Sequence, residues 1–469
     1  MKHRVGTSAR RRDFLASLCG GAVAGLALSG RRGMAAGPGA GLQAGEGVID
    51  ITPPLGIEMG GFHRPLGKER RIKGIRQPTA ARALVLQLGE ARTAICSLDV
   101  CGTSREMAQR IQQEVGRQTR IPTQNVRICS THTHSMPAFC YLRQWGRFSP
   151  EYMTAVEKKT VEAVRLAEAD LAPAELSLGK TPVVGGNHNR TTKKYKADAE
   201  FAKDSTDAQR WLDTMLHALV FRRSRAKRDL VWYHFSAHAV CFADEMAGPD
   251  WPGAVAAEIR RKEKLDPSFL QGHCGDVNPG DGRDWRGEIS QTTAAIAPAL
   301  RRAIAAAKPL EVDRLQTRSQ PFQVPFDVEL LKSWRETYRK DPANCKGGQW
   351  VDAGFAAEWY RANANRDPRE THLPITLSAI RLGPVGLLFH PAELYSYYGL
   401  AIRRDSPLPD TLVVGYADGI IGYLADPQAY RVGEYAAMTV PKILDYPPFV
   451  PGAASQMTAA ALALLQQTV

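Results

Sequence analysis

The residues best suited to chemistry form the run Ser130-Thr131-His132-Thr133-His134-Ser135, which directly follows the apolar segment 126–129. In an extended chain alternate side chains face the same way, so we expect His132 and His134 on one side, about 6.5–7 Å apart. A single metal ion could then bind one imidazole directly, while the other contacts substrate or hydrogen-bonds nearby. The alternative is a pair of hydrogen-bonded loop histidines, which the clustering and the flanking hydroxyl residues disfavour.

Four further positions, spread along the chain, carry side chains that could take part in the same site. His238 comes shortly after the strand-like segment 230–235, and Glu393 lies where an apolar strand meets the start of a helix. Tyr423 lies in a glycine-rich stretch, and Asn278 lies in the turn Gly275-Asp-Val-Asn-Pro279. Taken singly, each has an ordinary interpretation, because a carboxylate also favours a helix N-terminus and a tyrosine between glycines also packs.

Apolar periodicity indicates the elements that must position these residues. Strands and helices alternate, which predicts an α/β fold with a mixed β-sheet core and flanking helices in one large domain. The polar stretch 191–207 and the segment 341–371 are predicted to be surface excursions. The predicted strands are 93–99, 125–130 and 230–235, with a hairpin of 375–382 and 385–389; the predicted helices are 104–117, 151–169, 252–263, 290–307 and 458–467.

Composition excludes several classes of protein. Of 469 residues, 44% are hydrophobic and 23% charged, which is ordinary globular usage and argues against a disordered or multi-span membrane protein. The net charge is +13, of which residues 1–32 contribute +6, leaving +7 for the remainder. Neither a zinc finger nor a basic stripe interleaved with aromatics is present, so we expect no nucleic-acid partner and at most peripheral membrane contact.

The amino-terminal residues 1–36 have the pattern of an export signal. Arg11 and Arg12 precede a short, glycine-rich apolar run, and small residues follow around Met34-Ala35-Ala36. This is typical of a twin-arginine signal peptide and predicts a bacterial protein that the twin-arginine export machinery carries to the periplasm or outside the cell. An uncleaved anchor is the alternative. Eight cysteines without a CxxC pair argue against a cysteine-based metal site.

Taken together in chain order, these motifs resemble the neutral/alkaline non-lysosomal ceramidase family over about residues 47–445. Any one motif is weak, but this many in collinear order is specific. The matching segments are Asp50-Ile-Thr-Pro-Pro-Leu-Gly56, Met59-Gly-Gly-Phe62, Arg82-Ala-Leu84, Ser97-Leu-Asp99, Thr131-His-Thr-His-Ser135, Asn187-His-Asn-Arg190, His238 with Asp250-Trp-Pro-Gly253, Gly275-Asp-Val-Asn-Pro279, Pro391-Ala-Glu393 and Gly422-Tyr423 through Tyr435.

The resemblance implies a ceramidase-like zinc hydrolase domain over 47–469. The resemblance implies that His132, His238, Glu393 and Tyr423 hold Zn²⁺, with Tyr416, seven residues earlier in the sequence, as the alternative to Tyr423. It also implies that His134 orients or deprotonates a water or donates to the oxyanion, and that Arg190 and Tyr435 hold substrate or stabilise the oxyanion. Asn278 completes the candidate catalytic residues, because its amide can donate a hydrogen bond to a substrate carbonyl or hydroxyl. The expected reaction is cleavage of an amide in an N-acyl substrate, lipid or small molecule, by zinc-activated water.

Three departures from the family pattern bear on the substrate. Asn278 stands where the ceramidases have a serine, and an amide cannot accept an acyl group, so direct attack by water is expected. Met136-Pro137-Ala138 replaces a Gly-Pro pair, and the sequence ends at Val469 without the further β-sandwich domain of the ceramidases. A smaller amide or ester is therefore an alternative to a ceramide-like substrate. A family member that binds metal without catalysis is the other alternative.

Overall fold

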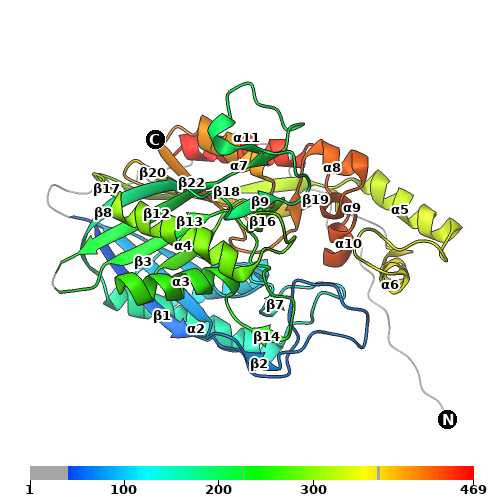
Figure 1. Cartoon of the computed structure of the whole chain (residues 1–469), viewed down its shortest axis with the longest axis horizontal. Helices are drawn as coiled ribbons and strands as arrows, with labels where there is room; N and C mark the ends of the chain where they lie inside the picture. Colours follow the sequence, from blue (N-terminus) through cyan, green and yellow to red (C-terminus); the bar gives the residue numbers. More distant parts are fainter. Residues whose placement is uncertain (1–40, 225, 367–369) are drawn as a thin grey trace, which may run out of the picture. The chain divides into compact units, whose positions relative to one another are not determined.

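A computed structural model of the chain describes residues 41–224, 226–366 and 370–469 (Figure 1). Within these residues the largest sheet has nine strands in the order β15-β13-β12-β8-β1-β3-β4-β6, and β17 pairs with β8. Most neighbours are antiparallel, whereas β4/β6 and β13/β15 are parallel, so the sheet is mixed as predicted. Its strands are β1 (Gln43–Asp50), β3 (Ala80–Leu88), β4 (Ala91–Leu98), β6 (Val126–Ser130), β8 (Ala172–Pro182), β12 (Met215–Arg223), β13 (Leu230–Phe235), β15 (Ser268–Gln271) and β17 (Lys308–Pro309).

A second sheet, which the sequence did not indicate as separate, packs against the first. It contains β18 (Leu315–Pro325), β19 (His372–Leu382), β20 (Val385–Phe389) and β22 (Asp410–Val414) in that order. The predicted hairpin is confirmed as β19 and β20, joined at Gly383 with φ +57°. Alternate apolar side chains from both sheets form one buried cluster between them, which includes Leu84, Phe221, Trp232, Ile380, Leu387 and Leu412.

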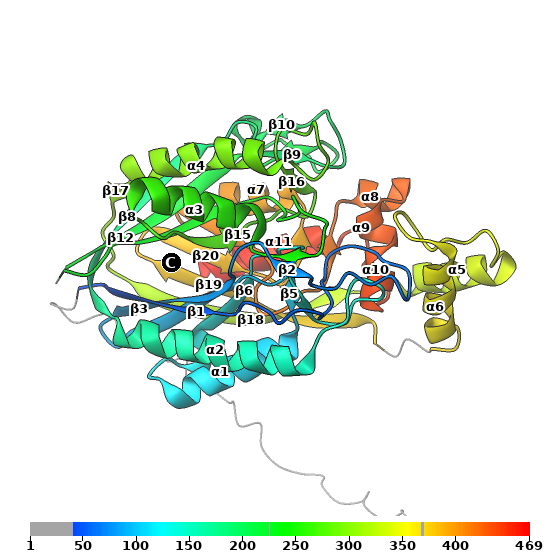
Figure 2. The same ribbon diagram turned by 60° about the horizontal axis from the view of Figure 1, so that its bottom comes forward.

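Helices cover the outer face of each sheet. In Figure 2, α1 (Arg105–Gln118) and α2 (Pro150–Ala169) lie together on one side, and α3 (Asp250–Glu263) and α4 (Ile289–Ala305) lie together on the other. The first pair packs on β1, β3, β4 and β6 and the second on β8, β12, β13 and β15. The smaller sheet is covered by α7 (Ser396–Asp405) and α11 (Ala453–Gln466). The predicted helices are present, although the last begins five residues before 458.

Local sequence explains where these helices start. Ser104, the predicted N-cap of α1, accepts a hydrogen bond from the backbone N–H of Met107, and Ser149 caps α2 in the same way ahead of Pro150. The buried positions of α1 recur every three to four residues, which gives the helix one apolar face for the sheet.

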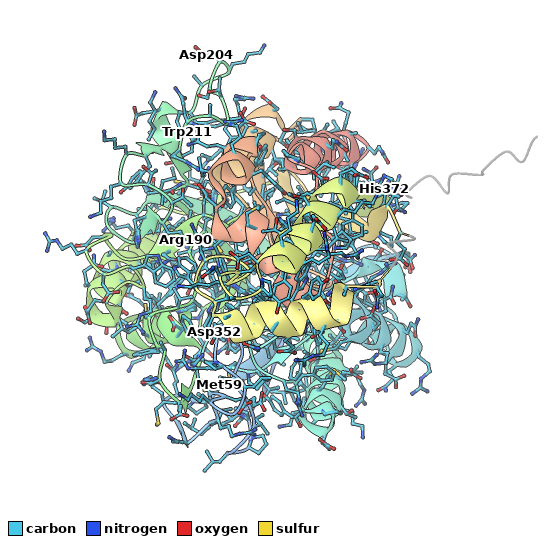
Figure 3. The ribbon with its side chains drawn as sticks, turned by 90° about the vertical axis from the view of Figure 1, so that its right-hand side faces the viewer. Met59, Arg190, Asp204, Trp211, Asp352 and His372 are labelled. Carbon is cyan, nitrogen blue, oxygen red and sulfur yellow. The ribbon has the colours of Figure 1, made fainter. Side chains whose placement is uncertain are left out.

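The segment 341–371 differs from its prediction in one respect. It contains α6 (Ala353–Asn363), whose Phe355 and Trp359 are buried, and it packs against α5 (Val328–Lys340). Most of 341–354 is exposed, so the excursion lies at the surface as predicted but carries a helix that the sequence did not indicate. Figure 3 looks onto this side of the molecule, with Asp352 at the start of α6 and with Met59 and Arg190 labelled nearby in the view.

Candidate metal centre and its surroundings

The two histidines of the Thr131–Ser135 run do converge, but not through strand alternation. Strand β6 ends at Ser130, and His132 has a left-handed backbone conformation with φ +60°. The imidazoles meet edge to face with centroids 4.7 Å apart, and their Nε2 atoms are 3.1 Å apart. The extended geometry expected for this run was wrong, because a turn at His132 brings the two rings much closer than a strand would.

Backbone carbonyl groups orient two imidazoles toward one point. The Nδ1 atom of His132 lies 2.7 Å from the carbonyl oxygen of Cys101, and Nδ1 of His238 lies 3.0 Å from that of Val277. A carbonyl oxygen can only accept, so each Nδ1 carries the proton and each Nε2 keeps its lone pair free. This is the tautomer that a metal-binding histidine requires.

A carboxylate and a phenol reach the same point through a short parallel pairing. Strands β21 (Glu393–Leu394) and β23 (Tyr423–Leu424) place Glu393 directly beside Tyr423. The Oε2 atom of Glu393 lies 3.5 Å from Nε2 of His132 and 3.3 Å from Nε2 of His238, and the Tyr423 hydroxyl lies 3.4 Å from Nε2 of His238. Donors held at about 2.0–2.2 Å in a tetrahedron around Zn²⁺ are about 3.3–3.6 Å apart, so these separations fit a tetrahedral ion.

Tyr416 is the second phenol near the cluster. Its ring stacks on His132 with centroids 4.2 Å apart, and its hydroxyl lies 3.2 Å from Sγ of Cys274 and 3.4 Å from Oε2 of Glu393. The hydroxyl of Tyr423 instead accepts a hydrogen bond from the guanidinium of Arg190 at 2.6 Å. Burial raises the pKa of both phenols, but at Tyr423 the Arg190 cation opposes that rise by stabilising the phenolate, which makes Tyr423 the better fourth donor of the two.

Burial keeps the imidazoles of this cluster neutral. It lowers the pKa of His132 to about 4 and holds the pKa of His238 and of His134 well below the usual value for histidine. Neutral imidazoles are the form that binds a cation, and a neutral His134 can accept a proton.

Arg190 and Asn278 come from two motifs that pair as a ribbon. Strand β9 (Asn187–Asn189) runs antiparallel to β16 (Val277–Pro279), which joins two sequence motifs far apart in the chain. Arg190 donates to Tyr423 and to the carbonyl oxygen of Gly275, and lies 3.5 Å from Oδ1 of Asn278. The buried Asn278 donates through Nδ2 to the carbonyl oxygen of Trp285 at 2.6 Å. Asn278 therefore contacts Arg190 and holds the loop that contains Trp285.

The backbone of the histidine run is clamped by residues that sequence reasoning missed. The buried guanidinium of Arg70 donates to the carbonyl oxygens of Gly60, His134 and Asp244. Gly61, with φ +96°, lies so close that a Cβ there would be 2.4 Å from the His134 ring. A buried arginine with only carbonyl partners carries no sequence signature. The Met59-Gly-Gly-Phe62 motif was the one available signal for the contact with Gly61.

The Asp250-Trp-Pro-Gly253 motif supports His238 in a similar way. The carboxylate of Asp250 accepts the backbone N–H groups of Cys241, Phe242 and Trp251, and the indole N–H of Trp251 donates to the carbonyl oxygen of His238 at 2.8 Å. The motif therefore fixes the backbone that presents the imidazole.

Two hollows that share lining residues adjoin the cluster. A chamber of about 40 Å³, here called the inner chamber, is lined by His132, His134, Glu393, Tyr423 and apolar side chains. An outer cavity of about 400 Å³, here called the vestibule, shares His134, Tyr423 and Tyr435 with it. The vestibule falls within the size range of small-molecule sites. Its aromatic walls, Phe62, Trp145, Trp285 and Trp350, were not among the predicted site residues.

The structure thus brings seven of the eight predicted site residues to one buried cluster or its two hollows. The eighth, Asn278, lines neither hollow and contacts Arg190. Two imidazoles and a carboxylate that could together hold a metal ion, with the Tyr423 phenol beside them and an open cavity nearby, suit a metal-dependent hydrolase.

Comparison with known proteins agrees with this class. The model of the neutral/alkaline non-lysosomal ceramidase N-terminal domain matches residues 42–279, and the chain belongs to this hydrolase family. A neutral ceramidase from Mycobacterium tuberculosis is 29% identical over 269 residues, which cover 51% of this chain and 40% of that protein. The chain therefore aligns with less than half of this relative's length.

Solved structures show the same fold. The neutral ceramidase of Pseudomonas aeruginosa superimposes with a TM-score of 0.69 at 18% identity, over 91% of this chain and 74% of that one. A ceramidase complexed with C2 gives 0.69 at 17% identity, over 91% and 75%. The predicted fold class and the family resemblance are confirmed.

Two predictions concern location, namely the export signal at 1–36 and at most peripheral membrane contact. The export signal lies outside the described residues. Among the residues that are described, no helix is both long and apolar enough to cross a bilayer.

Proposed function

We propose that the chain is a zinc-dependent amidohydrolase that cleaves the amide bond of an N-acyl substrate. The observation that carries the proposal is the set of 3.3–3.5 Å separations linking His132, His238, Glu393 and Tyr423, which matches the edges of a tetrahedral site. When bound, Zn²⁺ would polarise the amide carbonyl and lower the pKa of a water molecule.

The protein's own residues supply positioning and proton transfer in this proposal. Nε2 of His134 lies beside the cluster, at 3.1 Å from Nε2 of His132, and a neutral imidazole there can take a proton from the attacking water. Arg190 places a fixed positive charge where the carbonyl oxygen becomes negative. Burial raises the pKa of Tyr435, so its hydroxyl stays protonated and can donate to the same oxygen.

Attack by water, without a covalent acyl intermediate, follows from the position of Asn278. No hydroxyl is present at this position, and its amide is engaged with the carbonyl oxygen of Trp285. An amide is not an acyl acceptor, so hydrolysis proceeds in one displacement and not in two.

The test combines metal analysis with a matched pair of variants. We expect about one zinc per chain by elemental mass spectrometry and chelator-sensitive hydrolysis of N-acyl compounds. His238→Ala should lose the metal while keeping its circular dichroism spectrum, and His372→Ala, which removes an exposed histidine from the start of β19, should keep it. Metal retained by His238→Ala, or stoichiometric metal without any hydrolysis, would contradict the proposal; the second result would favour a binding protein.

On sequence grounds we also propose export by the twin-arginine machinery to the periplasm or beyond. Replacing Arg11 and Arg12 by lysine should leave the protein in the cytoplasm, as measured by fractionation. Unchanged export of that variant would exclude this route.

A further inference from the structure

The walls of the vestibule are aromatic and partly exposed. Trp285 and Trp350 remain 41% and 54% exposed although their rings meet edge to face at 5.2 Å. The ring of Trp350 also lies 4.6 Å from that of Tyr435, and Trp145 closes the inner side. Exposing a large aromatic surface to water costs free energy. When such side chains surround a cavity, the cavity suits a flat apolar group that packs against them.

These walls are held in place before any ligand binds. Trp350 has the left-handed φ of +62°, an unfavourable conformation for a bulky residue, and the adjacent Gln349 accepts hydrogen bonds from the Tyr435 backbone N–H and the Thr439 hydroxyl. The Asn278 side-chain amide holds the loop of Trp285 by donating a hydrogen bond to the Trp285 carbonyl oxygen. The residue that replaces the family serine thus positions one wall of the vestibule.

The charge of the vestibule is positive. Among the described residues that line it, Arg64 and Arg190 carry guanidinium groups, neither Asp nor Glu is present, and the Tyr423 hydroxyl of the cluster is already paired with Arg190. Arg190 already donates to Tyr423 and Gly275. The guanidinium of Arg64 donates to the carbonyl oxygen of His63 at 2.8 Å, and among the described residues Arg64 forms no ion pair with a carboxylate. Its backbone N–H is fixed to the carbonyl oxygen of Gln144. Arg64 therefore presents an uncompensated cation to a ligand.

The inner chamber limits what can lie beyond the cluster. At about 40 Å³, against about 400 Å³ for the vestibule and about 300–1,000 Å³ for typical small-molecule sites, the inner chamber is too small for a long acyl chain. Cys140, Ile420 and Leu444 line both this chamber and a separate cavity of about 500 Å³, so they form the wall between them. A long acyl chain would have to displace that wall.

We propose that the substrates are N-acyl aromatic amino acids with a short acyl group and a free carboxylate. This inference rests on the proposed amidohydrolase function. The acyl group lies in the inner chamber, the carboxylate pairs with Arg64, and the aromatic side chain packs against Trp285 and Trp350. Water adds to the amide carbonyl, the C–N bond breaks with its electron pair going to nitrogen, and nitrogen gains a proton. The products are a short carboxylic acid and the free amino acid.

Calorimetric titration into protein carrying His134→Ala, which lacks the proposed proton acceptor, tests the binding separately from turnover. The probes are N-acetyl-phenylalanine and its neutral primary amide, each titrated into the full chain. We expect the carboxylate to bind at least ~10-fold more tightly, which corresponds to ~1.4 kcal/mol. Arg64→Gln should remove this preference, and the matched Arg147→Gln, an exposed arginine outside the vestibule, should keep it. Equal affinity for both probes, or an equal loss in the two variants, would overturn the inference.

Hydrolysis of the same probes separates this inference from the proposed function. Metal-dependent release of acetate from both probes without a carboxylate preference would refute the inference and leave the amidohydrolase standing. A carboxylate preference in binding with no hydrolysis of either probe would refute the amidohydrolase and leave the ligand class standing. N-octanoyl-phenylalanine should be cleaved at least ~10-fold more slowly than the acetyl compound; equal or faster cleavage would refute the short-acyl assignment.

Discussion

Nε2 of His238 lies 3.3 Å from Oε2 of Glu393, although 155 positions separate the two residues in the chain. Both side chains are almost fully buried. A buried carboxylate gains little electrostatic stabilisation from neutral imidazoles. A cation shared by Glu393, His238 and His132 would stabilise all three side chains.

The metal is therefore expected to stabilise the fold. An ion that binds only the folded state adds about 2.7 kcal/mol when its free concentration is a hundred times its Kd. Removing the metal with a chelator should lower Tm measured by scanning calorimetry, and added Zn²⁺ should restore it. The His238→Ala variant should show no response to either treatment. A chelator effect of the same size in that variant would mean that the ion binds elsewhere.

Gly61→Ala should damage catalysis without removing the metal. A Cβ at this position would lie 2.4 Å from the His134 ring, so the imidazole would have to move. Displacement of a catalytic group by about 1 Å lowers activity by about 10²-fold. The control is Gly67→Ala, since Gly67 also has a positive φ (+81°) but nothing lies within 4 Å of its added carbon. Steady-state kinetics and zinc content should be measured for both, and comparable activity in the two variants would show that His134 is not essential.

Trp251→Phe should loosen the metal. The substitution removes the hydrogen bond from the indole N–H to the carbonyl oxygen of His238, and loss of such an outer partner lowers metal affinity by about 10–100-fold. Trp334→Phe is the matched control, because its buried indole nitrogen has no hydrogen-bond partner among the described residues. Competition with a fluorescent zinc chelator gives both affinities. Equal affinities would mean that the bond does not position the imidazole.

Lys442 should give the protein a stability that rises with pH. Burial lowers its pKa to about 7, and the cation–π contact with Trp334 at 3.6 Å opposes this shift. Between about pH 7 and its usual pKa near 10.5, the unfolded chain binds more protons than the folded one, so unfolding becomes harder as pH rises, by at most about 1.4 kcal/mol per pH unit. Lys442→Met should lack this slope in denaturant titrations at several pH values. A slope shared by both proteins would assign it to other groups.

Single-step hydrolysis predicts the absence of an acyl-enzyme. Pre-steady-state release of the amine product should show no burst, because Asn278 offers no nucleophile. Mass spectrometry of the quenched enzyme should find the unmodified chain. A burst, or an added acyl mass, would require another side chain to act as nucleophile.

Sequence alone determined most of the secondary structure and the membership of the candidate site. Caps such as Ser104, apolar periodicity in the helices and apolar runs in β4, β6 and β13 are local properties, so they are readable without a structure. The histidines, Glu393 and Tyr423 could be nominated because their types suit a cation and their order matched a family.

Tertiary structure decided what the cluster can hold and what can approach it. The turn at His132, the parallel pairing of Glu393 with Tyr423, and the carbonyl partners of both imidazoles depend on contacts between distant segments. The same holds for the second sheet and for the place of Trp350 beside Tyr435. Such contacts depend on how whole elements pack, and no local pattern encodes that packing, so the size and charge of the vestibule emerge only in the folded chain.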